Sequence, residues 1–173
     1  MGRHSSDGPD SFEIDWRADQ RGAAQRGEHP LLLASMRSGW AVMGETQFLP
    51  GYVVLLSRAD DVRHLTDLPR TQRAEFLADL GLLGEAVMTV CNGLDPSLRR
   101  LNYEILGNRE SYLCAHVFPR YGWEDPELLS ESVWHYPADR WTSPRDAYAE
   151  EHEPMREAIS AELHRIMAEA YGP

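Results

Sequence analysis

The stretch Leu101-Asn-Tyr-Glu-Ile-Leu-Gly-Asn-Arg-Glu-Ser-Tyr-Leu-Cys-Ala-His-Val-Phe-Pro-Arg120 decides the fold of this chain. Residues alternate in character from Tyr112 to Phe118, and a β-strand sends alternate side chains to opposite faces. We therefore expect Tyr112, Cys114, His116 and Phe118 on one face, and the apolar residues between them on a face that a core covers. A purely structural strand does not need a reactive cysteine and histidine two residues apart.

A second strand is expected just before this one, from about Leu101 to Leu106. The link of residues 107–111 is short enough for a hairpin, so the two strands are predicted to pair antiparallel.

The remaining chain contains further strand and helix signals. Strands are expected at 40–43 and 52–57, which are rich in Val, Leu and aromatic residues. Helices are expected at 17–25, at 31–36, from Thr71 to about Asn92-Gly93, and from 147 onward. The long helix contains Gly81 and Gly84, which we expect to permit close packing of the helix on the sheet. The aromatic stretch after Arg120 is expected to be irregular.

Length and charge limit the possible functions. The 173 residues suit a flexible tail at 1–11 followed by one domain at 12–173. The net charge of −11 argues against nucleic-acid binding, because phosphate backbones require a basic surface. An anionic small molecule would need a locally positive pocket, for which Arg99, Arg100, Arg109 and Arg120 are candidates.

The chain has no apolar run of about 20 residues and begins with a polar segment, so we expect no membrane partner and a cytoplasmic location. Its two cysteines, Cys91 and Cys114, have no spacing that suggests a disulfide or a zinc site. We expect no metal and no cofactor.

Two interpretations of Cys114 and His116 are open from the residues alone. The imidazole can lower the pKa of the thiol, which is how cysteine nucleophiles arise at neutral pH. The alternative is a half-buried cysteine beside a solvated histidine, with no chemical role.

Several motifs in the same order resemble the histidine triad (HIT) superfamily, in its diadenosine-tetraphosphate hydrolase-like branch. The resemblance covers roughly residues 33–137. The segment Phe48-Leu-Pro-Gly-Tyr-Val-Val-Leu-Leu56 resembles the family's Pro-Gly-His strand, with Tyr52 replacing the histidine. His64-Leu-Thr-Asp-Leu68 resembles the lead into its long helix, and the hairpin from Asn102 to Tyr121 is similar to the segment that contains the triad.

The resemblance implies an α+β fold with an antiparallel sheet of about five strands, a long packed helix and a C-terminal helix. It also implies a homodimer and a nucleotide or nucleoside phosphate as the small-molecule ligand. The family motif alternates three histidines with apolar residues, and Tyr112, Cys114 and His116 occupy the three histidine positions. In the family the middle histidine attacks the α-phosphorus, the third contacts phosphate oxygens, and the first orients the site.

Cys114 and His116 are accordingly the candidate catalytic residues. The candidate substrate-binding residues are Tyr112, Asn108, Arg109, Ser111 and Arg120. Each has a plainer alternative: Tyr112 can serve packing, the turn residues can be merely polar, and Arg120 can pair with Glu124 or Asp125 at the surface.

Three interpretations of Cys114 remain open within the resemblance. It can be a substitute nucleophile in a hydrolase or transferase acting at the α-phosphate of a dinucleoside polyphosphate or an AMP conjugate. It can mark a lapsed enzyme that binds nucleotides as a sensor or regulatory module. It can also mark a pocket repurposed for a biosynthetic transfer or a lyase step.

Overall fold

The computed structural model describes residues 15–172, so the tail expected at 1–11 lies outside the described part. Five strands form one antiparallel sheet in the order β1-β2-β3-β5-β4. They are β1 (Leu32–Ser35), β2 (Gly39–Met43), β3 (Val53–Ser57), β4 (Leu98–Glu104) and β5 (Cys114–Tyr121). The predicted α+β fold, the two early strands and the antiparallel hairpin of β4 and β5 are confirmed.

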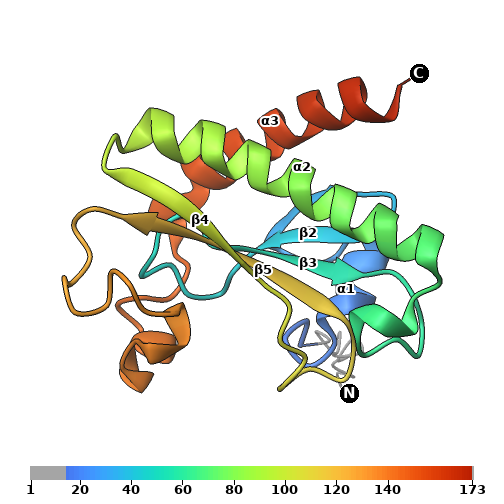
Figure 1. Cartoon of the computed structure of the whole chain (residues 1–173), viewed down its shortest axis with the longest axis horizontal. Coiled ribbons are helices and arrows are strands. Elements are labelled where there is room, and N and C mark those ends of the chain that lie inside the picture. Colours follow the sequence, from blue (N-terminus) through green and yellow to red (C-terminus); the bar gives the residue numbers. More distant parts are fainter. Residues whose placement is uncertain (1–14, 173) are drawn as a thin grey trace, which may run out of the picture.

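Three α-helices accompany the sheet: α1 (Gln20–Arg26), α2 (Arg70–Leu94) and α3 (Glu153–Tyr171). Helices α2 and α3 pack on each other and on one face of the sheet, and both lie above it in Figure 1. Buried residues of α2 and α3, such as Phe76, Leu83 and Ile159, share one core with the odd-numbered residues Ala115 and Val117 of β5. The alternation predicted for β5 therefore places its apolar face under the helices.

Helix α2 passes close to the edge strand β4 at Gly84. A Cβ atom at Gly84 would lie 2.0 Å from the hydroxyl oxygen of Tyr103, so a larger residue cannot fit without displacing that side chain. Gly81 has nothing within 4 Å of its Cβ position. The close-packing prediction is confirmed for Gly84 and wrong for Gly81.

The helix predicted at 31–36 is wrong, because this segment contains strand β1. Leu32, Ala34 and Ser35 pair with β2, with an irregularity between Leu32 and Ala34. A short apolar run suits a buried strand as well as a helix, and here pairing with a neighbouring strand decides. Helix α2 begins at Arg70, one residue before the predicted start at Thr71, and continues past Asn92-Gly93 to Leu94.

The opposite face of the sheet is covered by α1 and by the irregular segment 122–146. This face contains a second apolar cluster that includes Trp40, Val54 and Phe118 from the sheet and Val133 and Tyr136 from the segment. Short 3-10 turns at Val133–His135 and Ala138–Trp141 interrupt the segment, which lies beneath β4 and β5 in Figure 1. Within residues 15–172, no helix combines the length and the apolar character that a membrane crossing requires.

Candidate functional site

A cleft of about 940 Å³ opens on the sheet face opposite α2. Its floor is formed by residues of β3 and β5, and the loop 106–110 and the segment around Trp134 and Trp141 form its walls. Cys114 and His116 both line it. A cavity of this size accommodates a ligand as large as a nucleotide.

Cys114 and His116 lie on the same face of β5, as their spacing predicts. The Sγ atom of Cys114 is 3.6 Å from Nε2 of His116. The other ring nitrogen of His116, Nδ1, is 2.8 Å from the hydroxyl oxygen of Tyr52, which directly precedes β3. The three side chains form a chain of polar contacts that runs from the buried hydroxyl to the thiol.

Aromatic rings surround His116 on several sides. The rings of His116 and Phe118 lie 6.0 Å apart and nearly parallel, and Tyr52 stacks on Phe118 at 4.1 Å. Trp134 meets the His116 ring edge-on at 5.8 Å and stacks on Trp141 at 4.6 Å. Offset-stacked and edge-on arrangements are the ones that aromatic rings prefer, so the imidazole sits in a well-defined orientation.

Glu104 fixes the wall of the cleft to its floor. It is the cross-strand partner of His116, and its carboxylate accepts a hydrogen bond from the indole Nε1–H of Trp134. This contact ties the segment 122–141 to β4 at the level of the site.

The thiol and the imidazole are both uncharged at neutral pH. Burial raises the pKa of Cys114 to about 11, and the nearby Glu110 carboxylate adds to the rise. Burial lowers the pKa of His116 to about 4. Desolvation disfavours the charged form of either group, so the unliganded site contains no thiolate–imidazolium pair.

The cleft has more carboxylates than guanidinium groups along its walls. The carboxylates are Glu45, Glu110, Glu150 and Glu153, and the guanidinium groups are Arg17 and Arg109. Arg17 pairs with Glu45 at 2.8 Å. Among residues 15–172, Arg109 has no carboxylate within ion-pair distance, so it is the cation available to an anionic ligand.

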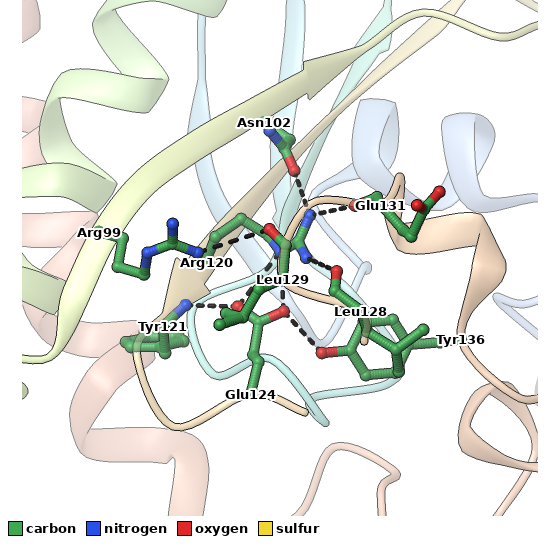
Figure 2. Close-up of polar contacts among 9 residues, drawn as sticks. All are labelled: Arg99, Asn102, Arg120, Tyr121, Glu124, Leu128, Leu129, Glu131 and Tyr136. Carbon is green, nitrogen blue, oxygen red and sulfur yellow. Dashed lines mark hydrogen bonds and ion pairs between the residues drawn. The ribbon is translucent and has the colours of Figure 1, made fainter. Parts of the chain in front are cut away.

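Arg120 occupies a different place from the one predicted. Its side chain is 3% exposed and forms an ion pair of 2.8 Å with Glu124, which is itself buried. Figure 2 shows that its guanidinium also donates to Asn102 Oδ1 and to the main-chain oxygens of Leu128 and Glu131. The pairing with Glu124 is confirmed, but it is a buried contact that holds the segment 122–136 and not a surface pair.

Glu124 completes this cluster. Its carboxylate also accepts hydrogen bonds from the backbone N–H of Tyr121 and from the hydroxyl of Tyr136 (Figure 2). The cluster lies beyond Phe118, and Arg120 does not line the cleft that contains Cys114.

The structure brings together five of the seven candidate residues. Asn108, Arg109, Tyr112, Cys114 and His116 line the cleft, whereas Ser111 and Arg120 do not. Tyr112 precedes β5, and the centre of its ring lies 5.6 Å from the guanidinium carbon of Arg21 in α1.

The roles of Tyr52, Glu104 and Trp134 were not predicted from the sequence. Tyr52 had a usable signal, since it stands in the position of a family histidine. Glu104 and Trp134 are 30 residues apart and meet only in the folded chain. No grouping of three His, Cys, Asp or Glu side chains suited to a metal ion occurs in the part of the chain that the structure describes.

Neither the models of known protein families nor the sequences of curated proteins match this chain. Several solved structures are similar to this chain. A histidine triad protein from Sinorhizobium meliloti is 15% identical with a TM-score of 0.62, over 90% of this chain and 96% of that one. A histidine triad protein from Marinobacter aquaeolei is 22% identical with a TM-score of 0.56, over 80% and 88%.

A third similar structure is a hypothetical histidine triad nucleotide-binding protein from Sulfolobus tokodaii. It is 11% identical with a TM-score of 0.59, over 84% of this chain and 91% of that one. At such low identities the likeness concerns the fold. The chain has the fold of the histidine triad proteins, as the motifs predicted.

Proposed function

We propose that this protein binds a nucleoside phosphate in the cleft, with His116 donating a hydrogen bond to a phosphate oxygen. The observation that carries the proposal is the position of His116: its Nε2 atom lies at the cleft, beside Cys114, at the third position of the triad motif. The fold supports the same ligand class, since one protein of similar structure is called a nucleotide-binding protein.

The two ends of such a ligand have different partners in the cleft. The aromatic side chains of Tyr112, Trp134 and Trp141 offer flat apolar surfaces to a base. Asn108 and Arg109 lie on the loop 106–110, where an amide and a guanidinium can contact phosphate oxygens. Because the other charges of the cleft are mainly negative, we propose a ligand with few phosphates.

Isothermal titration calorimetry with AMP, adenosine and diadenosine tetraphosphate tests the ligand class. We expect AMP to bind at least tenfold more tightly than adenosine, because only AMP offers an oxygen anion to His116 and Arg109. Equal affinity for AMP and adenosine would contradict the assignment of the phosphate, and no binding of any of the three would remove the proposal.

The state of Cys114 favours binding without a covalent step. A thiol with a pKa of about 11 is almost entirely protonated at neutral pH, and the thiolate is the nucleophile. We therefore propose that the protein is a nucleotide sensor or regulatory module. The second candidate is a hydrolase or transferase at the α-phosphate, which the proximity of Cys114 to His116 favours.

Turnover and intact mass distinguish these candidates. The wild type, Cys114→Ala and Cys114→His are incubated with diadenosine tetraphosphate and with an AMP phosphoramidate. The sensor proposal predicts no turnover by the wild type and by Cys114→Ala. Turnover by the wild type that Cys114→Ala abolishes, with an added mass equal to AMP, would identify a thiol nucleophile instead.

We also propose a homodimer formed through the outer surface of α2 and β4. Leu77 and Met88 of α2 and Tyr103 of the edge strand β4 are large apolar side chains that are 39–48% exposed. Light scattering should give twice the mass of the chain for the wild type, and Met88→Glu should give a monomer.

The two free thiols, Cys91 and Cys114, suit a reducing compartment such as the cytoplasm.

A further inference from the structure

We propose that Tyr52 is a positioning residue that places the ring proton of His116 on Nε2. In this arrangement His116 is a hydrogen-bond donor toward the cleft and is unable to act as a base for Cys114. The proposal concerns the unliganded protein, so it stands apart from the identity of the ligand.

The proton assignment follows from the donors and acceptors at the Tyr52 hydroxyl. This hydroxyl is 2.8 Å from Nδ1 of His116, and the Tyr52 side chain is buried. A neutral imidazole has one protonated nitrogen and one acceptor nitrogen. If the hydroxyl donates to Nδ1, then Nδ1 is the acceptor and the proton of the ring is on Nε2.

The opposite assignment leaves a buried donor without a partner. If Nδ1–H donated to the tyrosine oxygen, the tyrosine proton would need a different acceptor. Among the described residues, the Tyr52 hydroxyl has one hydrogen-bond partner, which is His116. An unsatisfied buried hydroxyl costs about 1–3 kcal/mol. Burial also raises the pKa of Tyr52, which keeps the hydroxyl protonated as a donor.

The contact with Tyr52 and the surrounding aromatic rings orient the imidazole of His116. The ring of Phe118 lies parallel to the imidazole with an interplanar angle of 7°. The ring of Trp134 meets the imidazole edge-on, with an interplanar angle of 88°. Glu104 holds Trp134 in this position. Nε2 is therefore kept toward the cleft, 3.6 Å from Cys114 Sγ.

This arrangement leaves the buried thiol of Cys114 without a base that could take up its proton. The titratable groups that face Cys114 are His116, Tyr112 and the carboxylate of Glu110, while Tyr52 and Glu104 lie behind His116. None of them supplies a positive charge, and in this tautomer the ring nitrogen next to Cys114 already carries a proton, so it cannot accept the proton of the thiol. By fixing this tautomer, Tyr52 keeps His116 from acting as the general base for Cys114.

The same Nε2–H group favours the binding of an anionic ligand. An Nε2–H group that points into the cleft donates to an anionic oxygen without any change of charge on the ring. This last step rests on the proposed function, because it assumes a phosphate oxygen at that place. The position of the proton does not depend on it.

Two-bond ¹H–¹⁵N correlation spectra of histidine rings report which nitrogen carries the proton. We expect the wild-type protein at pH 7 to show His116 with a proton on Nε2, with the resonances assigned by their loss in His116→Asn. A proton on Nδ1 would overturn the proposal. This measurement needs no folded variant of Tyr52.

Tyr52→Phe removes the hydroxyl and keeps the ring that stacks on Phe118. We expect the proton of His116 to redistribute between the two nitrogens, so that Nε2 can accept the proton of Cys114. The rate of Cys114 alkylation by iodoacetamide at pH 7.5 should then rise about tenfold, because the freed ring nitrogen can take up the thiol proton as a general base. An unchanged rate, together with an unchanged tautomer in the variant, would overturn the role of Tyr52.

Tyr103→Phe is the control, because it removes a tyrosine hydroxyl that does not line the cleft. We expect it to leave the tautomer of His116 unchanged. A purely structural effect of losing a tyrosine hydroxyl would alter the alkylation profile in both variants, and this result would count against the proposal. Nucleotide titrations do not enter either measurement, so a failure of the proposed function is recognised separately.

Discussion

Arg120 and Glu124 are both buried, and each compensates the charge of the other. Removing one partner of a buried ion pair leaves an uncompensated charge, which costs about 3–5 kcal/mol. We expect Glu124→Leu to lower the free energy of unfolding by this amount, because the guanidinium of Arg120 would keep only its neutral acceptors. Urea denaturation followed by circular dichroism measures the change.

The double variant Arg120→Met/Glu124→Leu is the control for this prediction. It removes both charges, and we expect it to be more stable than Glu124→Leu alone. If Glu124→Leu costs less than about 1 kcal/mol, a value typical of exposed pairs, the buried pair does not hold the segment 122–136 as described.

Single residues also show where sequence reasoning ends. The alternation in β5 was enough to place Cys114 and His116 on one face, because a strand has a fixed period. The short separation of Arg120 and Glu124 in the chain allowed their pairing to be predicted, but nothing local indicated that the pair would be buried away from the cleft. Its partners Asn102, Leu128 and Glu131 come from two other segments, which only the folded chain brings together.

Near the C-terminal end of α3, a hydrogen bond joins this helix to α2. The hydroxyl of Tyr171 donates to Oδ1 of Asp79, a residue that is 1% exposed and whose carboxylate also accepts from Ser38. Hydrogen bonds to charged groups contribute about 1.5–3 kcal/mol. We expect Tyr171→Phe to lower the free energy of unfolding by about this amount and to increase amide hydrogen exchange in the last turns of α3.

Glu157→Ala tests the specificity of that effect, since Glu157 is exposed on the same helix. It should change the unfolding free energy by less than about 0.5 kcal/mol. Equal effects of the two substitutions would show that the Asp79 contact does not anchor α3.

The elements differ in how well the sequence predicted them. Long periodic segments such as α2 and α3 were found because many positions agree on one period. The segment 31–36 was assigned to a helix because four apolar residues suit either structure, and only pairing with β2 decides between them. The site wall at 122–141 has no period, so its contact with Glu104 was not predictable.

At the scale of the whole molecule, one buried and one half-buried histidine make stability depend on pH. Burial lowers the pKa values of His29 and His116 to about 4, below the value of 6.5 expected when the chain is unfolded. The unfolded state therefore binds more protons between pH 6.5 and pH 4, and the native state loses stability as the pH falls through this range. Each histidine contributes roughly 2 kcal/mol to the loss by pH 5.

Urea denaturation at pH 7 and pH 5 measures this loss, and His29→Asn should remove about half of it. A free energy of unfolding that is the same at both pH values would show that neither imidazole resists protonation in the native state.

The central claim is that His116 makes the cleft a binding site for a nucleoside phosphate. The most direct measurement is the affinity for AMP, by calorimetry, of the wild type, His116→Asn and His135→Asn. His135 is exposed on the segment 122–141 and does not line the cleft, so its substitution is a matched control. We expect AMP to bind the wild type and His135→Asn alike, and His116→Asn at least tenfold more weakly. Equal AMP affinity of the wild type and His116→Asn would contradict the claim.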